Sequence, residues 1–176
     1  EMNYMNGLWT ARVTSHIPFA DIVENIDIQN VIDVIMLAHD TVKRIKNRKP
    51  KIIVSALNPH SGEGGLFGTE EAEILTPAIR ECNKESISVS GPFSADTIFL
   101  KAFKEDYDVV VSMYHDQGQI ALKAIGLEKG VTINAGLEFP VVTPAHGTAF
   151  DIAGSNEAGE GALNEAIKLC IRMANN

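Results

Sequence analysis

Three of the five histidines in this sequence stand just after short β-like runs. They are His16, His60 and His115, and the runs before them span 12–15, 52–56 and 108–111. A neutral imidazole is a good ligand for a divalent transition metal, and an adjacent carboxylate such as Asp116 can ligate the metal or orient the ring. Because loops at one edge of a parallel sheet converge, the three imidazoles could share one ion and leave a position open for substrate. Three unrelated surface histidines are the alternative.

The loop around His60 is rich in glycine. Residues 58–68 contain Gly62, Gly64, Gly65 and Gly68. Glycine at this density lets the backbone turn tightly and approach a ligand closely. The same residues could also form only a flexible loop, and the functional interpretation depends on the neighbouring His60.

These residues need a scaffold, and strand-like runs alternate with helix-like patterns along the chain. Strands are expected at 12–15, 52–56, 86–89, 109–112 and 131–134, and helices at 21–26, from 27 or 30 to 46, from 69, 94–103, 119–125 and 161–174. The alternation predicts an α/β fold with a mostly parallel sheet flanked by helices. Residues 1–11 are expected to be an irregular lead-in that packs through Trp9, and His39 is expected on a helix surface.

Composition excludes several classes of protein. The chain has 176 residues, enough for one domain with a real core, and a net charge of -8 that argues against a nucleic-acid partner. No apolar stretch is long enough for a membrane span, and no signal peptide is visible. Cys82 and Cys170 are interpreted as free thiols, which indicates a reducing, cytoplasmic location. The first strand is not followed by the glycine fingerprint of a Rossmann domain.

Five motifs occur together in a characteristic order: Ser15-His16-Ile17-Pro18, Leu57 to Gly65, Gly91-Pro92 with Ala95-Asp96-Thr97, Tyr114 to Gly118, and His146 to Ala149. In this combination they resemble the C-terminal half of the 4-hydroxythreonine-4-phosphate dehydrogenase family of vitamin B6 synthesis. The resemblance covers nearly the whole chain. It implies a fold similar to that of isocitrate and isopropylmalate dehydrogenases. Residues 1–176 would be one α/β domain, with the N-terminal domain of the family absent because the chain is a fragment, a truncation or half of a split protein.

The resemblance also implies a set of site residues. A divalent metal (zinc, cobalt or magnesium) would be held by His16, His60 and His115, with one histidine supplied by the partner subunit of a homodimer that shares its active site. Lys123 falls where the family has a lysine that contacts the substrate. Our own hypothesis adds that Asp96 and Asp116 could orient the histidines or complete the metal shell, and that Lys123 could pair with an anionic group of the substrate. NAD would bind at the loop that carries His146, Gly147, Thr148, Ala149 and Asp151. His146 could be a structural or cofactor-loop residue, or a proton carrier.

Two positions depart from the family pattern. Thr132 and Val141 stand where the family usually has asparagine and arginine, both of which touch the substrate. Valine cannot replace the bidentate binding of a phosphate or carboxylate by arginine. The substrate could therefore be a related four-carbon acid phosphate such as 4-phosphoerythronate.

The function expected from the sequence is NAD-dependent, metal-assisted oxidation and decarboxylation of a small phosphorylated hydroxy acid such as 4-hydroxythreonine 4-phosphate, in pyridoxal phosphate biosynthesis. Two alternatives remain open. The chain could be a metal-binding or dimerising domain without activity of its own, or it could be a metal hydrolase that uses the same histidines and needs no NAD.

Overall fold

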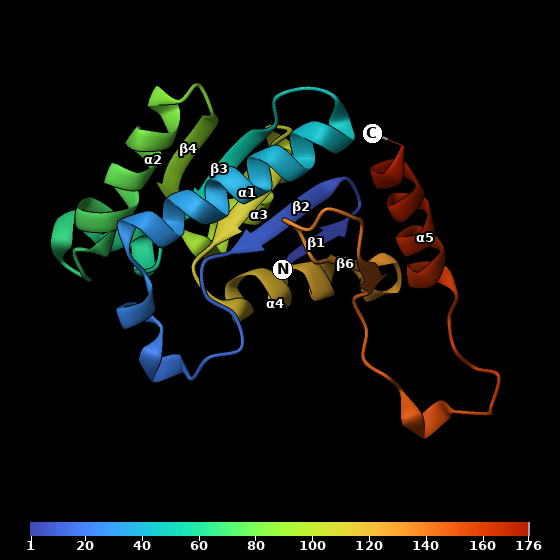
Figure 1. The fold of residues 1–176 in the computed structure, drawn as a ribbon. Helices are drawn as coiled ribbons and strands as arrows, with labels where there is room; N and C mark the ends of the chain where they lie inside the picture. The colour runs from blue at the N-terminus through green and yellow to red at the C-terminus, as the bar shows by residue number, and fades with distance from the viewer. Residues whose placement is uncertain (176) are drawn as a thin grey trace.

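Seven strands form one sheet, with helices on both faces, in the computed structural model, which describes residues 1–175 apart from the side chain of Leu127 (Figure 1). The strands are β1 (Met2–Met5), β2 (Leu8–Arg12), β3 (Lys51–Ser55), β4 (Ser88–Phe93), β5 (Val109–Ser112), β6 (Val131–Ile133) and β7 (Val142–Pro144). The helices are α1 (Ile28–Lys46), α2 (Thr76–Lys84), α3 (Ala95–Lys104), α4 (His115–Gly126) and α5 (Gly161–Ala174). Shorter helical turns lie at Phe19–Asp21, Val23–Asn25, Pro59–Gly65, Glu71–Leu75, Leu127–Lys129 and Phe150–Ile152.

The strand order is β4-β3-β5-β2-β1-β6-β7. Neighbouring strands from β4 to β2 run parallel, whereas β1 is antiparallel to both β2 and β6, and β7 is antiparallel to β6. Five strands (β2, β3, β4, β5 and β6) therefore point in one direction. The predicted α/β fold with a mostly parallel sheet is confirmed.

The first eleven residues are not an irregular lead-in, so that prediction was wrong. They form a β1–β2 hairpin in which Met5 pairs with Leu8, and Asn6 and Gly7 make the turn with φ of 49° and 90°. Two consecutive residues with positive φ define the tight turn that suits the twist of a hairpin, and Asn-Gly is its commonest sequence. The predicted packing through Trp9 is confirmed, since this side chain is fully buried.

The two faces of the sheet carry different helices. Alternate strand residues such as Ile52 and Val111 pack in a large core cluster with α1, α2 and α5, whereas Ile53 and Val110 pack against α3 on the other face. This alternation follows from the two-residue period of a strand. Helix α4 lies on the same face as α3, along β5 and β2 (Figure 1).

Helix α1 begins as predicted, because the Asp27 carboxylate caps it by accepting a hydrogen bond from the Asn30 backbone N–H at 2.8 Å. The prediction for His39 was wrong, because its ring is buried with Ile35 and Val42 on the helix face that covers the sheet. Helix α4 starts at His115 rather than Gln119, which places this histidine in the first helical turn. None of the helices within residues 1–175 has the length and hydropathy of a membrane span.

Candidate active site

Strand order brings His16 and His115 together. Strands β2 and β5 are neighbours. The segments that follow them also pair, because the Thr14 backbone N–H donates to the Met113 carbonyl at 3.0 Å. The two imidazole rings have centroids 5.3 Å apart and planes tilted by 46°. They line one pocket of about 190 Å³, together with Thr14, Ser15, Ile17, Phe19, Ile22, Tyr114 and Asp116. The structure therefore places two of the predicted metal ligands side by side.

His60 lies in an adjoining pocket of about 580 Å³, which Asp96 and Gln117 also line. The two pockets share Phe19, Ile22 and Tyr114, and the Phe19 and Tyr114 rings meet edge to face at 5.8 Å. Among residues 1–175, no group of three or more His, Cys, Asp or Glu side chains is close enough to hold a metal ion. A third histidine ligand from a second chain stays a prediction.

The glycine-rich loop that presents His60 is fixed by a buried carboxylate. Glu71 accepts hydrogen bonds from the backbone N–H groups of Leu57 and Asn58 at 2.9 and 2.7 Å. A Cβ atom at Gly62, where φ is +77°, would lie 2.7 Å from Glu71 Oε2, so this position has no room for a side chain. The loop is thus an ordered part of the site.

All three site histidines have Nδ1 next to a polar neighbour in their own segment. The partners of His115, His60 and His16 are Asp116 Oδ1 at 2.7 Å, Glu63 Oε2 at 3.1 Å and Ser15 Oγ at 3.4 Å. A hydrogen bond at Nδ1 sets the tautomer and orients Nε2 toward a ligand, as in metal sites. Buried His39 has the same arrangement with Asp40, so the pairing alone does not identify a ligand. The three differ from His39 in being exposed or half-buried and in lining two adjoining pockets, and their imidazole donors fit a divalent metal.

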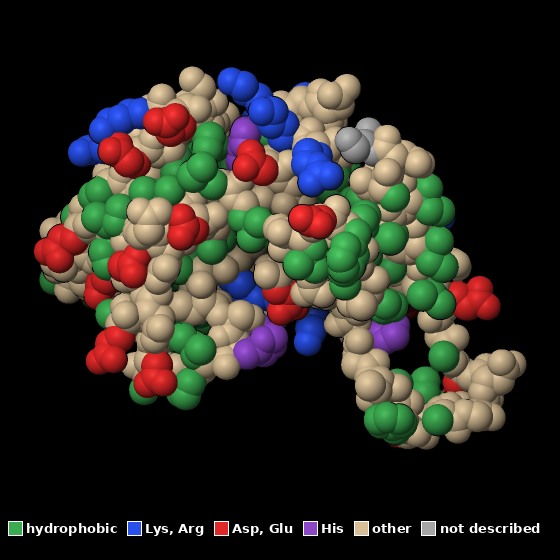
Figure 2. Space-filling view, viewed as in Figure 1, with side chains coloured by type: hydrophobic (Ala, Val, Ile, Leu, Met, Phe, Trp, Pro, Cys, Tyr) green, Lys and Arg blue, Asp and Glu red, His purple; other side chains and the backbone are tan. Residues whose placement is uncertain are grey.

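Two of these histidines have left-handed backbone, with φ of 26° at His16 and 51° at His60. Residues other than glycine rarely adopt this region, and such strain gathers at ligand sites, where surrounding contacts enforce it. In the space-filling view, histidine side chains lie on the lower middle surface, with acidic and basic side chains directly above them (Figure 2).

The predicted substrate residues lie further along the same face. Lys123 is exposed on α4, two turns after His115, and the Thr132 hydroxyl on β6 accepts from the Asn3 side-chain amide at 2.9 Å. Val141 directly precedes β7. His115 and Lys123 therefore lie in the first and last turns of α4.

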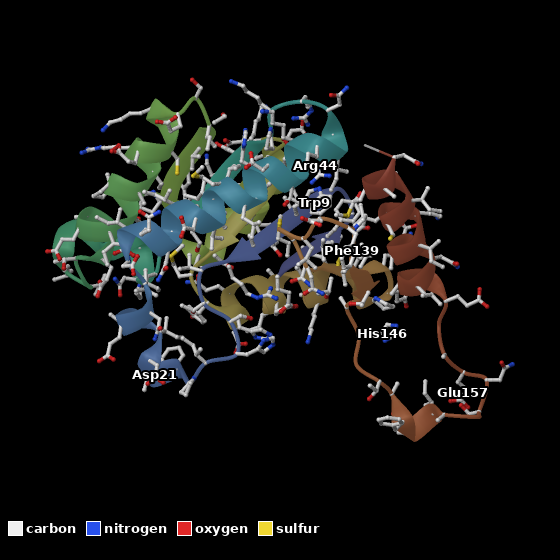
Figure 3. The ribbon with its side chains drawn as sticks, viewed as in Figure 1. Trp9, Asp21, Arg44, Phe139, His146 and Glu157 are labelled. Carbon is white, nitrogen blue, oxygen red and sulfur yellow. The ribbon has the colours of Figure 1, made fainter. Side chains whose placement is uncertain are left out.

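The predicted cofactor residues belong to the segment between β7 and α5, which extends away from the body of the molecule (Figure 1). Figure 3 shows His146 and Glu157 on its two limbs. His146, Gly147 and Ala149 line a pocket of about 800 Å³ together with Glu128, Lys129, Ile152, Glu157, Ala158, Gly159, Gly161 and Ala162. Thr148 and Asp151 lie on this segment but do not line the pocket, which adjoins the end of α4 opposite to His115.

Sequence reasoning missed a cluster of polar side chains around Arg12, on strands β1 and β2 and helix α4. The Arg12 guanidinium, 1% exposed, donates to Asn3 Oδ1 at 2.7 Å and to Ser15 Oγ at 3.1 Å, and pairs with Glu1 Oε1 at 2.9 Å. The Gln119 amide on α4 donates to Asn3 Oδ1 at 2.9 Å or, in its swapped orientation, accepts from Arg12 Nη1 at 3.0 Å. A charged residue at the end of an otherwise uncharged strand was the available signal.

Comparison with known proteins agrees with this architecture. The family model described as "Pyridoxal phosphate biosynthetic protein PdxA" matches residues 1–170. The 4-hydroxythreonine-4-phosphate dehydrogenase of Beijerinckia indica is 46% identical over 164 residues, which cover 93% of this chain and 49% of the relative. The D-threonate 4-phosphate dehydrogenase of Salmonella typhimurium is 43% identical over 171 residues, which cover 97% of this chain and 52% of the relative. The chain thus spans about half the length of these curated relatives.

Solved structures show the same relationship. The 4-hydroxythreonine-4-phosphate dehydrogenase of Klebsiella pneumoniae superposes with a TM-score of 0.87 at 35% identity, over 98% of this chain and 53% of the other. A β-decarboxylating dehydrogenase of Thermococcus kodakarensis shares the fold alone, with a TM-score of 0.59 at 18% identity, over 84% and 43%. The extent of the sequence match places the chain in the pyridoxal phosphate biosynthetic protein PdxA family.

Proposed function

We propose that this chain is the C-terminal α/β domain of an NAD-dependent, divalent-metal-assisted dehydrogenase. The enzyme oxidises and decarboxylates a phosphorylated four-carbon hydroxy acid such as 4-hydroxythreonine 4-phosphate, in pyridoxal phosphate biosynthesis. Relatives at 43–46% identity are named as dehydrogenases of two such substrates. The observation that carries the proposal is the pair of His16 and His115 rings, 5.3 Å apart at the carboxyl ends of two parallel strands.

In this proposal a second subunit of a homodimer supplies the remaining ligand of the metal ion. His16 and His115 of one chain would bind it, and His60, which lies beyond the shared Phe19–Tyr114 contact, would serve the site of the partner. Asp116 holds the His115 ring by its Nδ1 atom. Asp96, which lines the His60 pocket, is a candidate to complete or orient the shell across the interface.

The chemistry divides between bound groups and side chains. A divalent ion supplies Lewis acidity, and NAD supplies a hydride acceptor. The chain positions the substrate hydroxyl beside His16 and His115, and Lys123 pairs with an anionic group of the substrate further along α4. The 146–151 loop, with His146, Gly147 and Ala149 in its pocket, holds the cofactor. Free Cys82 and Cys170 fit a reducing cytoplasm.

D-threonate 4-phosphate is a second candidate substrate. It is named for a relative that covers 97% of this chain, and it agrees with Thr132 and Val141 replacing the residues usual for 4-hydroxythreonine 4-phosphate. Both compounds carry a carboxylate, a hydroxyl and a phosphate. Specificity constants (kcat/KM) measured for both compounds under the same conditions will decide between them.

NADH formation with either substrate in the presence of Zn²⁺, Co²⁺ or Mg²⁺, and its loss on chelation, is the direct test. NAD should also produce a saturable heat of binding by calorimetry. Metal binding without NAD binding or NADH formation would instead favour a metal-binding or dimerising domain. Turnover in the absence of NAD would favour a hydrolase.

A further inference from the structure

The Arg12 guanidinium is a buried cation with one carboxylate partner. Its side chain is 1% exposed, and its Nε and Nη1 atoms donate to neutral oxygens of Ser15 and Asn3. Its formal partner is Glu1, which contacts Nη2 at 2.9 Å and whose own side chain is 28% exposed. A buried charge needs a compensating charge, so some anion must occupy the position beside Nη2.

The Glu1 carboxylate bridges Arg12 and the candidate metal site. Oε1 contacts Arg12, while Oε2 lies 4.0 Å from His16 Nδ1. Ser15 links the same two residues, because its hydroxyl accepts from Arg12 Nε and lies 3.4 Å from His16 Nδ1. The structure therefore has room for a carboxylate between a buried arginine and a histidine of the site.

We propose that Arg12, with Ser15 and Asn3 fixing its orientation, forms a subsite for the carboxylate of the substrate, and that the Glu1 side chain occupies this subsite when substrate is absent. The proposal rests on the proposed function and adds a specificity determinant to it. A substrate carboxylate would displace the partly exposed Glu1 side chain and take over its contact with Nη2.

The group that contacts the free side of the guanidinium in this structure is a carboxylate. Nε and Nη1 donate to Ser15 and Asn3, and Nη2 donates to one oxygen of the planar Glu1 carboxylate, which is the contact that a substrate carboxylate would take over. In its swapped orientation the Gln119 amide oxygen also lies 3.3 Å from Nη2. A phosphate has a different place to bind. Lys123 is exposed on α4, eight residues beyond His115, and is a separate cation for the phosphate in the proposed function.

Calorimetric binding of two matched ligands tests this subsite. D-threonate 4-phosphate carries the carboxylate, and D-threitol 4-phosphate has a CH₂OH group in its place. Arg12→Met should weaken binding of the first by about 10- to 100-fold, the range for a charge-assisted hydrogen bond, and change binding of the second by less than about two-fold. Arg12→Lys should restore part of the difference, because lysine keeps the charge but not the fork of donors.

Arg48→Met is the matched control, because it also removes an arginine from a carboxylate, at the opposite end of the sheet. It should leave the ratio of the two affinities unchanged even if stability falls. Equal weakening of both ligands by Arg12→Met would overturn the subsite and leave the proposed function intact. Failure of the wild-type protein to bind either ligand would refute the proposed function as well.

A second variant covers the case in which Arg12→Met does not fold, as judged by circular dichroism. Glu1→Gln removes the internal competitor and should tighten binding of D-threonate 4-phosphate by about three-fold or more, with no change for D-threitol 4-phosphate. Identical affinities in Glu1→Gln and wild type would contradict the displacement of Glu1.

Discussion

The two ends of β5 show two different uses of charged side chains. At the amino end, Asp108 is 3% exposed and accepts hydrogen bonds from Lys46, from both terminal nitrogens of Arg48 and from the Lys51 backbone N–H. At the carboxyl end, His115 is 37% exposed and its neighbour His16 is 73% exposed. The first cluster satisfies its buried charge internally, whereas the second leaves ring nitrogens accessible to a ligand.

This difference separates stability from binding. Burial alone would raise the pKa of Asp108, but hydrogen bonds from Arg48, Lys46 and the Lys51 N–H stabilise the carboxylate more strongly, so its pKa lies below the usual value. The same contact raises the pKa of Arg48. Because the Asp108 cluster is saturated, it has no capacity for substrate, and its role is to join α1, β3 and β5.

The largest effect should come from the histidine end. His115→Ala should remove most metal binding, measured as bound Zn²⁺ or Co²⁺ per chain by elemental analysis, and lower NADH formation at least about 100-fold. The free energy of unfolding should change by less than about 1 kcal/mol, because the side chain is partly exposed. His39→Gln is the control outside the site and should keep the metal. Full metal content in His115→Ala would rule this residue out as a ligand.

At the other end of β5, the effect should be on folding. Asp108→Ala leaves the Lys51 N–H and two cations without their acceptor. Urea denaturation should show a loss of about 3 kcal/mol, the lower end for breaking a buried pair, since Arg48 and Lys46 remain partly solvated. Metal stoichiometry of the folded fraction should stay at the wild-type value. A loss of metal without a loss of stability would show that Asp108 serves metal binding rather than folding.

The glycine-rich loop combines both roles. Gly62→Ala should cost about 2 kcal/mol, because the new Cβ meets Glu71 Oε2 at 2.7 Å and the backbone has φ of +77°. It should also weaken metal binding by displacing His60. Gly64→Ala is the control for the cost of placing alanine at a positive φ, because φ is +67° there and a Cβ meets nothing within 4 Å. Equal effects of the two substitutions on metal affinity would show that contact with Glu71 is unimportant.

The smallest effect should appear in the pH dependence of stability. Since the pKa of Asp108 is lowered in the folded protein, its contribution is present above the unfolded pKa of about 3.9 and disappears as pH falls through the folded value. Wild type should therefore lose its advantage over Asp108→Asn, by about 1 kcal/mol, between pH 5 and the lowest pH at which the protein stays folded. A difference independent of pH in urea titrations would show that the carboxylate charge does not matter.

Much of the scaffold could be predicted from the chain. The Asp27 cap, the apolar stripe of α1 and the β-branched run of β5 are local signals, and each was found at its place. Predictions failed where a local pattern was ambiguous or overlooked. The Asn6-Gly7 turn was missed, and so was the position of His39 beside Ile35, Ala38 and Val42 on the apolar stripe of α1.

The sequence by itself determined the α/β fold class and the strands that precede His60 and His115, because strand period, helix caps and turns depend on neighbouring residues. The strand before His16 was predicted at 12–15, whereas β2 spans Leu8–Arg12. The tertiary structure alone decided that β2 lies between β5 and β1, which joins His16 to His115, separates His60 from them and buries Arg12 beside Asn3 and Gln119. Strand order arises from packing between residues far apart in the chain, and no local periodicity encodes it.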